Sequence, residues 1–285
     1  MSKFERTVIT CPVCSYRLAK NKGLRTYKCG NNHSFDISKG NYVNLILPNK
    51  KKSNNPGDPK EMVAARTDFL ERGFYKKLSN IINTNITRQL QTLGIDEYKV
   101  LDLGCGEGYY LKNAMSVFKK KSMKTEFFGM DLSKHATQAA GKTIKGATIL
   151  VANNFSIPFE DKSLDLIYSV FSPADMAECS RVLKKNGFFV RILPNKDHLV
   201  ELKKAIYPTL TEKRINEFKT KEAGLTLVDK IDIKYEMELN KENLLSLLKM
   251  TPHYWRITPE DRENFGKHDS MIVTVDMALG VYKKA

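Results

Sequence analysis

VLDLGCGEG, residues 100–108, joins a short apolar run that ends at Leu103 to a loop with glycines at alternate positions. The apolar run predicts a buried strand, and the residues after the loop have helical composition. Glycine tolerates positive φ and lets the backbone pass close to a ligand. Ligands of doubly wound sheets bind at the carboxyl ends of the strands. We therefore expect a strand–loop–helix unit whose loop lines a ligand site.

The sequence around this loop alternates between strand-like and helix-like segments. The expected strands are Tyr98–Leu103, Glu126–Met130, Thr148–Ala152, Leu164–Phe171 and Phe188–Ile192. Such alternation predicts an α/β fold with a doubly wound parallel sheet. Near the end the alternation breaks, and strands are expected at Leu227–Tyr235 and Met271–Val281, with the helix Lys241–Met250 between them.

One amphipathic helix is expected before the first strand of this sheet. Apolar residues recur every three or four positions from Leu70 to Leu93, which is the period of a single helix face. Gly94 follows directly and suits a helix C-cap. The pattern therefore predicts a continuous helix over this stretch.

The spacing inside the glycine loop narrows the class of ligand. Dinucleotide enzymes use G-x-G-x-x-G, whereas here Gly104 and Gly106 belong to G-x-G-x-G directly after Asp102. Asp131 ends the second expected strand, where its two carboxylate oxygens can accept both hydroxyls of a ribose. The string resembles motif I of class I S-adenosylmethionine methyltransferases. An NAD enzyme and a sheet protein without a cofactor are the alternatives.

Later segments resemble the same class of enzyme in the expected order. Asn153 lies in VANN, residues 151–154, which with Ile157–Phe159 resembles the adenine-side segment. Leu164–Ser169 resembles the fourth strand, and Arg181–Phe189 resembles the helix, turn and fifth strand after it. The resemblance implies a class I (Rossmann-like) methyltransferase domain that uses S-adenosylmethionine.

Potential metal ligands gather near the N-terminus. The spacing is C-x₂-C-x₁₄-C-x₃-H, formed by Cys11, Cys14, Cys29 and His33. Thiolates and imidazole are zinc ligands, and four of them close a tetrahedral structural site. We expect a small zinc-ribbon-like module over residues 1–47, which is too short to bury a core unaided. The C-x₃-H arm is less standard than C-x₂-C, which makes His33 the weakest of the four assignments. The alternative is that all four are ordinary residues of a small reduced domain.

Positive charge is concentrated in the same part of the chain. The net charge is +15, and residues 1–60 hold twelve Lys or Arg against three Asp or Glu. This surplus favours a polyanionic partner, nucleic acid before acidic membrane, and a solubilising surface is the alternative. Residues 48–60 read as a basic linker in which Lys50, Lys51 and Lys52 would contact the backbone of a nucleic acid. The methyltransferase domain is expected over residues 61–285.

The composition also bears on location. No apolar run approaches the length of a membrane span, and Met1–Arg6 lacks the apolar region of a signal peptide. The five cysteines fit a reducing compartment. We expect a cytoplasmic protein that does not associate with a membrane, and the sequence leaves a homodimer open.

Longer strings resemble one family, the bacterial RlmA-type guanine-N1 methyltransferases of 23S ribosomal RNA. The strings are CPVC (11–14), HSFD (33–36), GNYVNL (40–45), PGD (56–58), EMVAAR (61–66), DLGCGEGYY (102–110) and LKMTPHYWR (248–256). The resemblance implies zinc on the four ligands above. It also implies cofactor contacts from Tyr75, from the loop with Glu107, and from His198. From its apolar helical surroundings alone, Tyr75 would be a packing residue.

The resemblance implies methylation of guanine N1 in a ribosomal hairpin loop, and one branch of the family bears on sensitivity to tylosin. Because guanine N1 carries a proton and faces its pairing partner, the base must be flipped out and a group must accept the proton. Asp175 and Glu178 follow the fourth strand and are candidate bases, or plain helix N-terminal acids. Phe171 either stacks on the guanine or belongs to the core.

Two other functions fit the sequence. One is a small-molecule methyltransferase, which would turn over without RNA. The other is an RNA-binding ribosome-assembly factor with a vestigial cofactor site, which would bind the cofactor without methyl transfer. Cys105, inside the glycine loop, is expected to pack and not to act as a nucleophile, because methylation of guanine N1 needs no covalent enzyme adduct.

Overall fold

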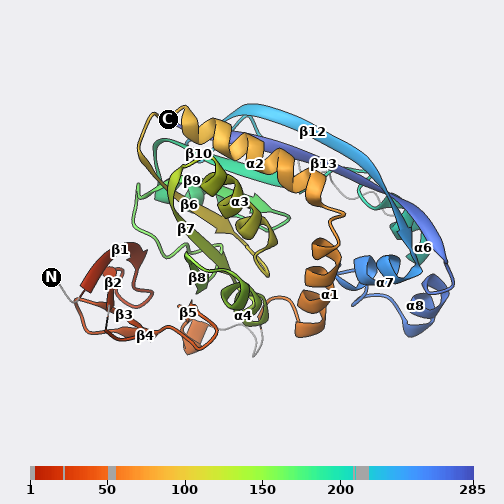
Figure 1. Ribbon diagram of the computed structural model, residues 1–285, viewed down its shortest axis with the longest axis horizontal. Coiled ribbons are helices and arrows are strands. Elements are labelled where there is room, and N and C mark those ends of the chain that lie inside the picture. Colours follow the sequence, from red (N-terminus) through yellow and green to blue (C-terminus); the bar gives the residue numbers. More distant parts are fainter. Residues whose placement is uncertain (1–3, 22, 51–55, 208, 210–217) are drawn as a thin grey trace.

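The computed structural model describes residues 4–21, 23–50, 56–207, 209 and 218–285. It contains a small four-stranded sheet and a nine-stranded sheet with helices on both faces (Figure 1). The strands of the small sheet are β1 (Phe4–Thr10), β2 (Arg17–Asn21), β3 (Thr26–Cys29) and β4 (Ser34–Asp36). The small sheet is antiparallel throughout, so the N-terminal module is a β-ribbon as expected.

The large sheet has the doubly wound topology that the alternation predicts. Its parallel strands are β6 (Glu97–Leu103), β7 (Lys124–Asp131), β8 (Ala147–Val151), β9 (Leu164–Val170) and β10 (Leu183–Pro194). Its antiparallel part consists of β13 (Ser270–Lys284), β12 (Leu225–Asn240) and β11 (Lys221–Glu222). The order is β11-β12-β13-β10-β9-β6-β7-β8-β5, with β5 (Tyr42–Asn44) at the edge beside β8. The chain adds β7 and β8 on one side of β6 and then β9 and β10 on its other side. This change of direction places the carboxyl ends of β6 and β9 at the crevice where such sheets bind ligands.

The remaining elements cover this sheet or connect its strands. They are η1 (Pro48–Lys50), α1 (Lys60–Glu71), α2 (Lys76–Gln91), α3 (Tyr109–Lys120), α4 (Lys134–Thr143), α5 (Met176–Val182), α6 (Val200–Ile206), α7 (Lys241–Lys249) and α8 (Pro259–Phe265). None of the helices described is long and apolar enough to cross a membrane.

The prediction of one continuous helix from Leu70 to Leu93 is wrong. The helix ends at Glu71, and the chain turns through Gly73 at φ +88° before α2 begins at Lys76. A left-handed residue cannot continue a right-handed helix, so the apolar period runs across two helices. The break makes Tyr75 the N-cap of α2 and not a mid-helix residue.

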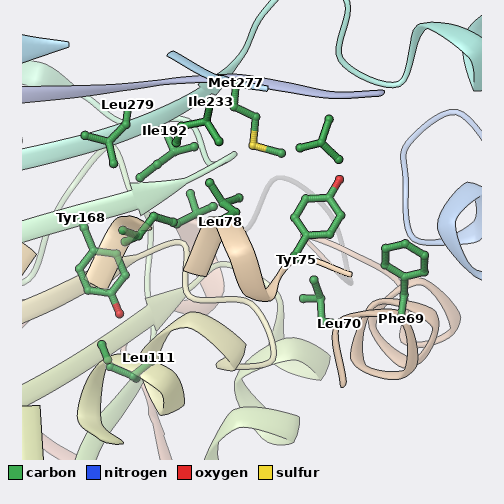
Figure 2. Packing of buried hydrophobic residues seen from close by; sticks show 14 of the residues in the cluster. Phe69, Leu70, Tyr75, Leu78, Leu111, Tyr168, Ile192, Ile233, Met277 and Leu279 are labelled. Atoms are coloured by element: carbon green, nitrogen blue, oxygen red, sulfur yellow. The ribbon is translucent and has the colours of Figure 1, made fainter. Parts of the chain in front are cut away.

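Helices α1 to α3 bury one face of the sheet. Phe69 and Leu70 of α1 pack with Tyr75, Leu78 and the strand residue Met277 in one hydrophobic cluster. Figure 2 shows Tyr75 inside this cluster, with Phe69 and Leu70 nearby. Burial of such side chains is worth roughly 1.5–3 kcal/mol each. The N-terminal helix pair is therefore an integral part of the methyltransferase fold.

The opposite face is buried by α5 together with the N-terminal module. Ile9 and Leu18 of the module share a second hydrophobic cluster with Leu101 of β6, Phe128 of β7 and Cys179 of α5. The module is therefore packed on the large sheet instead of being tethered by a free linker.

The segment Ile157–Glu160 joins the module to α5. The amide of Thr10 donates to the carbonyl of Pro158, and the amide of Glu160 donates to the carbonyl of Val8, both at 2.9 Å. Arg17 forms a bidentate ion pair with the Glu160 carboxylate at 2.5 and 2.6 Å. From the other side, Arg181 of α5 donates to the carbonyls of Ile157 and Phe159 at 2.7 and 2.8 Å.

The sheets divide the N-terminal region differently from the expected module of residues 1–47. Strand β5 (Tyr42–Asn44) pairs in parallel with β8, so these residues extend the large sheet. A three-residue edge strand has too little periodicity to be recognised in the sequence. The expected linker begins with η1, and its last residues are docked as well, since Ser133 Oγ donates to the carbonyl of Asp58 at 2.8 Å.

Candidate active site

A cavity of about 1130 Å³ opens at the carboxyl ends of β6, β7, β9 and β10. Seven of the eight residues expected to contact the cofactor line it: Tyr75, Gly104, Gly106, Glu107, Asp131, Asn153 and His198. Residues from Gly57 to His253 contribute to the same wall. The fold therefore brings these seven residues, chosen from the sequence, to a single site.

The glycine loop lies directly against the loop that follows β9. Gly104 has φ +79°, and a Cβ built there would lie 2.0 Å from Ser172 Oγ. Gly106 has φ +57°, but its Cβ would meet only Arg66, 3.7 Å away. Position 104 therefore excludes a side chain by close packing, while position 106 faces a more open part of the wall.

Asp131 fixes the glycine loop to the end of β7. Its carboxylate accepts hydrogen bonds from the amides of Gly106 at 3.0 Å and Ser133 at 2.8 Å. Burial raises the pKa of Asp131, while these two amide donors oppose that rise. The carboxylate lines the cavity at the strand end where ribose hydroxyls were expected to bind.

Glu107 has an acceptor atom without a partner among the described residues. Its Oε2 is buried and makes no hydrogen bond, and the nearest cation, Arg66 Nη1, is 4.0 Å away. Arg66 pairs more closely with Asp58, at 2.6 Å. Burial raises the pKa of Glu107, which the charge of Arg66 partly offsets.

These groups fit S-adenosylmethionine. A buried carboxylate oxygen without a donor costs free energy that a ligand donor would recover. Asp58, Glu107 and Asp131 surround one arginine, so the wall has a surplus of carboxylates. S-adenosylmethionine brings both a sulfonium and an ammonium cation to such a wall, and its ribose brings two hydroxyl donors.

Asp102 lies beneath the loop and does not line the cavity. Its side chain is 1% exposed and accepts a hydrogen bond of 2.9 Å from the Tyr168 hydroxyl. Burial raises the pKa of Asp102 well above its usual value. The geometry gives Asp102 a supporting position under the glycine loop instead of the direct cofactor contact expected from the sequence.

An aromatic wall stands beside the glycine loop. Phe171 has φ +58°, which is unusual for a bulky residue, and its ring is 41% exposed. It stacks on His198 with ring centroids 5.7 Å apart, and its centroid lies 6.3 Å from that of Tyr75 at a steep angle. Phe171 therefore belongs to the cavity wall and not to the core.

His198 is neutral in this wall. Burial, followed by the charges of Lys203 and His253, lowers the pKa of His198 to about 3. Its Nδ1 accepts a hydrogen bond from the amide of Asp276 at 3.4 Å, so Nε2 carries the ring proton. His198 can thus donate to a ligand but cannot contribute a positive charge there.

The two candidate bases, Asp175 and Glu178, do not line the cavity. Asp175 caps α5, accepting from the amides of Ala177 and Glu178 at 2.9 and 3.0 Å. Glu178 accepts from the amide of Ile157 and from Arg181, each at 2.8 Å, and Arg181 lowers the pKa of Glu178. The geometry favours the alternative role of helix N-terminal acids.

The four expected zinc ligands converge in the N-terminal module. The ligand atoms of Cys11, Cys14, Cys29 and His33 all lie within 4.8 Å of one another. His33 Nδ1 is 3.4 Å from Cys29 Sγ and 3.6 Å from Cys11 Sγ, and Cys14 Sγ is 3.7 Å from Cys29 Sγ. Tetrahedral zinc with sulfur at about 2.3 Å requires ligand separations of roughly 3.5–3.8 Å. The cluster therefore fits zinc, with His33 as the fourth ligand.

Comparison with known proteins supports both parts of the architecture. Residues 9–54 match the model of the RlmA N-terminal zinc ribbon, and residues 101–191 match a methyltransferase domain. A putative 23S rRNA (guanine-N(1)-)-methyltransferase of Bacillus subtilis is 30% identical over 278 residues, 96% of each chain. The chain belongs to the 23S rRNA (guanine-N1)-methyltransferase family. Its methyltransferase domain implies S-adenosylmethionine as cofactor, and its Cys₃His cluster implies zinc.

A further relative and a solved structure are also similar to this chain. The 23S rRNA (guanine(748)-N(1))-methyltransferase of Streptomyces fradiae is 30% identical over 70% of this chain and 67% of its own. Among solved structures, a putative methyltransferase from Bacillus halodurans aligns with 70% of this chain and 99% of its own, at 14% identity and a TM-score of 0.45.

Several cavity residues of this family member had no role in the expectations from sequence. They are Asp58, Met62, Arg66, Asn195, Lys196, Lys203, Tyr207 and the segment Met250–His253. Asp58, Arg66 and Met250–His253 fall within strings that carry the family resemblance, which was the available signal. The expected RNA contacts stay predictions, since Lys51 and Lys52 lie outside the described residues and Lys50 is the last residue of η1.

Proposed function

We propose that this protein transfers the methyl group of S-adenosylmethionine to N1 of a guanine in a hairpin loop of 23S ribosomal RNA. One observation carries the proposal: the glycine loop and its carboxylates line the same cavity as Phe171 and the segment after β9. The identity of the acceptor, N1 of a guanine in 23S ribosomal RNA, comes from the names of the relatives. The cytoplasmic location stays a prediction from the sequence, and the sequence leaves a homodimer open.

The cavity is large enough for two ligands. Its volume of about 1130 Å³ exceeds the roughly 300–1000 Å³ of typical small-molecule sites. The cofactor supplies a methyl group on a cationic sulfur, which is already a strong electrophile. The protein therefore has to align a flipped guanine with that methyl group, so positioning carries much of the rate.

The wall residues divide this work. Glu107 holds the cofactor by charge, and Asp131 holds it through the ribose. The loop at Gly104 sets the distance between the cofactor and Ser172. The exposed face of Phe171 offers a stacking surface for a flipped base. The zinc module and the basic residues around Lys50 hold the RNA backbone, with an affinity that falls as salt increases.

The proposal predicts methylation of large-subunit RNA at guanine N1. Unmodified 23S RNA is incubated with the protein and labelled cofactor, and the labelled nucleotide is mapped by nuclease digestion and mass spectrometry. We expect one labelled guanine in a hairpin loop, with the methyl group on N1. Label on another base or another guanine atom, or turnover of small molecules without RNA, would contradict the proposal. Binding of cofactor without transfer to any RNA would favour an assembly factor.

A further inference from the structure

A hydrogen-bonded tyrosine–histidine pair lies in the wall of the cavity. The hydroxyl oxygen of Tyr207 and Nδ1 of His253 are 2.9 Å apart, and the ring centroids are 5.5 Å apart at 69°. Tyr207 follows α6 and His253 follows α7, and the two residues are 46 positions apart in the sequence. Both line the cavity that holds the glycine loop and Phe171.

His253 lines the same cavity as Phe171 and His198. The charge of His253 is one of the influences that, after burial and Lys203, lower the pKa of His198. His198 in turn stacks on Phe171. The imidazole of His253 therefore lines the same cavity as the aromatic surface on which the acceptor base would stack.

The carboxylates of the described wall and its other histidine are poorly suited to accept a proton from guanine. Asp58 pairs with Arg66, and Asp197 pairs with Lys234 at 2.8 Å. Glu107 and Asp131 belong to the cofactor loop. Burial lowers the pKa of His198 to about 3, so this ring is a poor proton acceptor. Of the two histidines in the described wall, His253 is thus the remaining candidate for the base.

We propose that His253 accepts the N1 proton of the target guanine and that Tyr207 positions its ring, an inference that rests on the proposed guanine-N1 methylation. In this proposal His253 Nδ1 is the donor to the Tyr207 oxygen, so that Nε2 carries the lone pair that accepts the proton. A histidine with its second nitrogen fixed by a hydrogen bond is the usual arrangement of a general base.

The step balances without any further reactant. The N1 proton moves to Nε2 of His253, and the electron pair of that N–H bond stays on guanine. This pair forms the bond from N1 to the methyl carbon while the methyl–sulfur bond breaks and its electrons return to sulfur. His253 is left as an imidazolium, which releases its proton to solvent before the next turnover.

Charged neighbours in the wall suit this step. Lys203 of α6 and Lys196, which follows β10, line the same cavity as His253. As N1 loses its proton, negative charge develops on guanine O6, and cations at close range stabilise it. Arg66 holds the His253 segment from α1, because its Nη2 donates to the carbonyl of Met250 at 3.4 Å.

The test compares His253→Gln and Tyr207→Phe with wild type and with His268→Gln, a control at an exposed histidine outside the cavity lining. We expect His253→Gln to lower kcat by about 10²–10⁴-fold, the usual range for a lost general base. The KM for RNA and the calorimetric affinity for the cofactor should change less than threefold. Tyr207→Phe should lower kcat by roughly tenfold, since it removes one orienting hydrogen bond. His268→Gln should behave as wild type.

Two readouts separate proton transfer from a structural role. Wild-type kcat should fall on the acid side with a single ionisation, and His253→Gln should lose that dependence. Nitrogen NMR of the free protein should show the His253 ring proton on Nδ1, and Tyr207→Phe should shift it towards Nε2. A His253→Gln enzyme with wild-type kcat on guanine N1 would overturn this inference and leave the proposed function intact. A wild-type protein that methylates no guanine N1 would overturn both.

Discussion

The zinc cluster and the cavity are built in opposite ways. Four ligand atoms from residues 11–33 lie within 4.8 Å of one another, which leaves no open position on a tetrahedral ion. The cavity draws its wall from residues 57–253 and contains a carboxylate oxygen without a partner. A closed site of local origin serves stability, whereas an open site assembled from distant segments serves binding. Each experiment below tests one side of this difference.

The largest effect is expected from opening the zinc cluster. Cys14→Ser removes one of four ligands, and structural zinc in small domains contributes on the order of 10 kcal/mol of folding free energy. We expect zinc content below one equivalent by mass spectrometry, fast amide exchange in β1–β4, and at least tenfold weaker RNA binding. Cofactor affinity should stay within twofold. The control is Cys179→Ala, a buried cysteine of α5, which should retain one zinc. A full equivalent of zinc in Cys14→Ser with unchanged exchange would refute the site.

A smaller effect is expected from filling the glycine loop. In Gly104→Ala the new Cβ would lie 2.0 Å from Ser172 Oγ at φ +79°. Overpacking of this kind costs about 1–3 kcal/mol, and the loop must move. We expect at least tenfold weaker cofactor binding by calorimetry and a lower melting temperature.

Gly94→Ala is the matched control for that substitution. Gly94 has φ +61°, but a Cβ there would meet nothing within 4 Å. The variant should lose about 1 kcal/mol of stability from backbone strain and keep wild-type cofactor affinity. Equal cofactor affinity in Gly104→Ala and wild type would show that the loop does not contact the ligand.

The smallest effect is expected at the unpaired carboxylate. Glu107→Gln keeps the shape but removes the charge, so we expect cofactor binding weaker by roughly tenfold, the value of one charge-assisted hydrogen bond. Burial raises the pKa values of Glu107 and Asp131 above 4.5 and 3.8 respectively. Both carboxylates are therefore protonated at a higher pH than without burial, and cofactor affinity should fall as the pH is lowered through their raised pKa values.

The pH series also contains its own control. Glu107→Gln should flatten part of the affinity loss, while Glu61→Gln, at an exposed position in the first turn of α1, should follow the wild-type curve. If Glu107→Gln binds the cofactor as tightly as wild type at every pH, the carboxylate has no part in binding.

The features that were predictable from sequence are those with a local pattern. The Gly104–Gly108 loop, the acidic end of β7 and the Cys–His spacing each encode a site within a few residues, and the structure places them as expected. The doubly wound parallel part of the sheet follows from the strand–helix alternation. Pairings between distant segments leave no such pattern. The Tyr207–His253 hydrogen bond and the parallel pairing of Tyr42–Asn44 with β8 are examples.

The apolar periodicity also gave one wrong prediction, because a single residue overrides it. The apolar pattern continues through Gly73, yet a single left-handed residue divides the helix and brings Tyr75 to the cavity. For Asp175 and Glu178, residue type and position suggested acid–base chemistry. The amides of α5 donate to Asp175, and the guanidinium of Arg181 donates to Glu178, a fact that depends on three-dimensional neighbours.

The shared segment Ile157–Glu160 has a consequence for chimaeric enzymes. Its residues contact β1 and β2 of the zinc module on one side and Arg181 on the other. A zinc module grafted from another family member would meet a foreign partner at Pro158 and Glu160. A functional graft would therefore have to transfer this stretch together with the module. A zinc module exchanged between relatives would therefore have to match this packing surface. The surface lies in the middle of the catalytic domain, far along the chain from the linker.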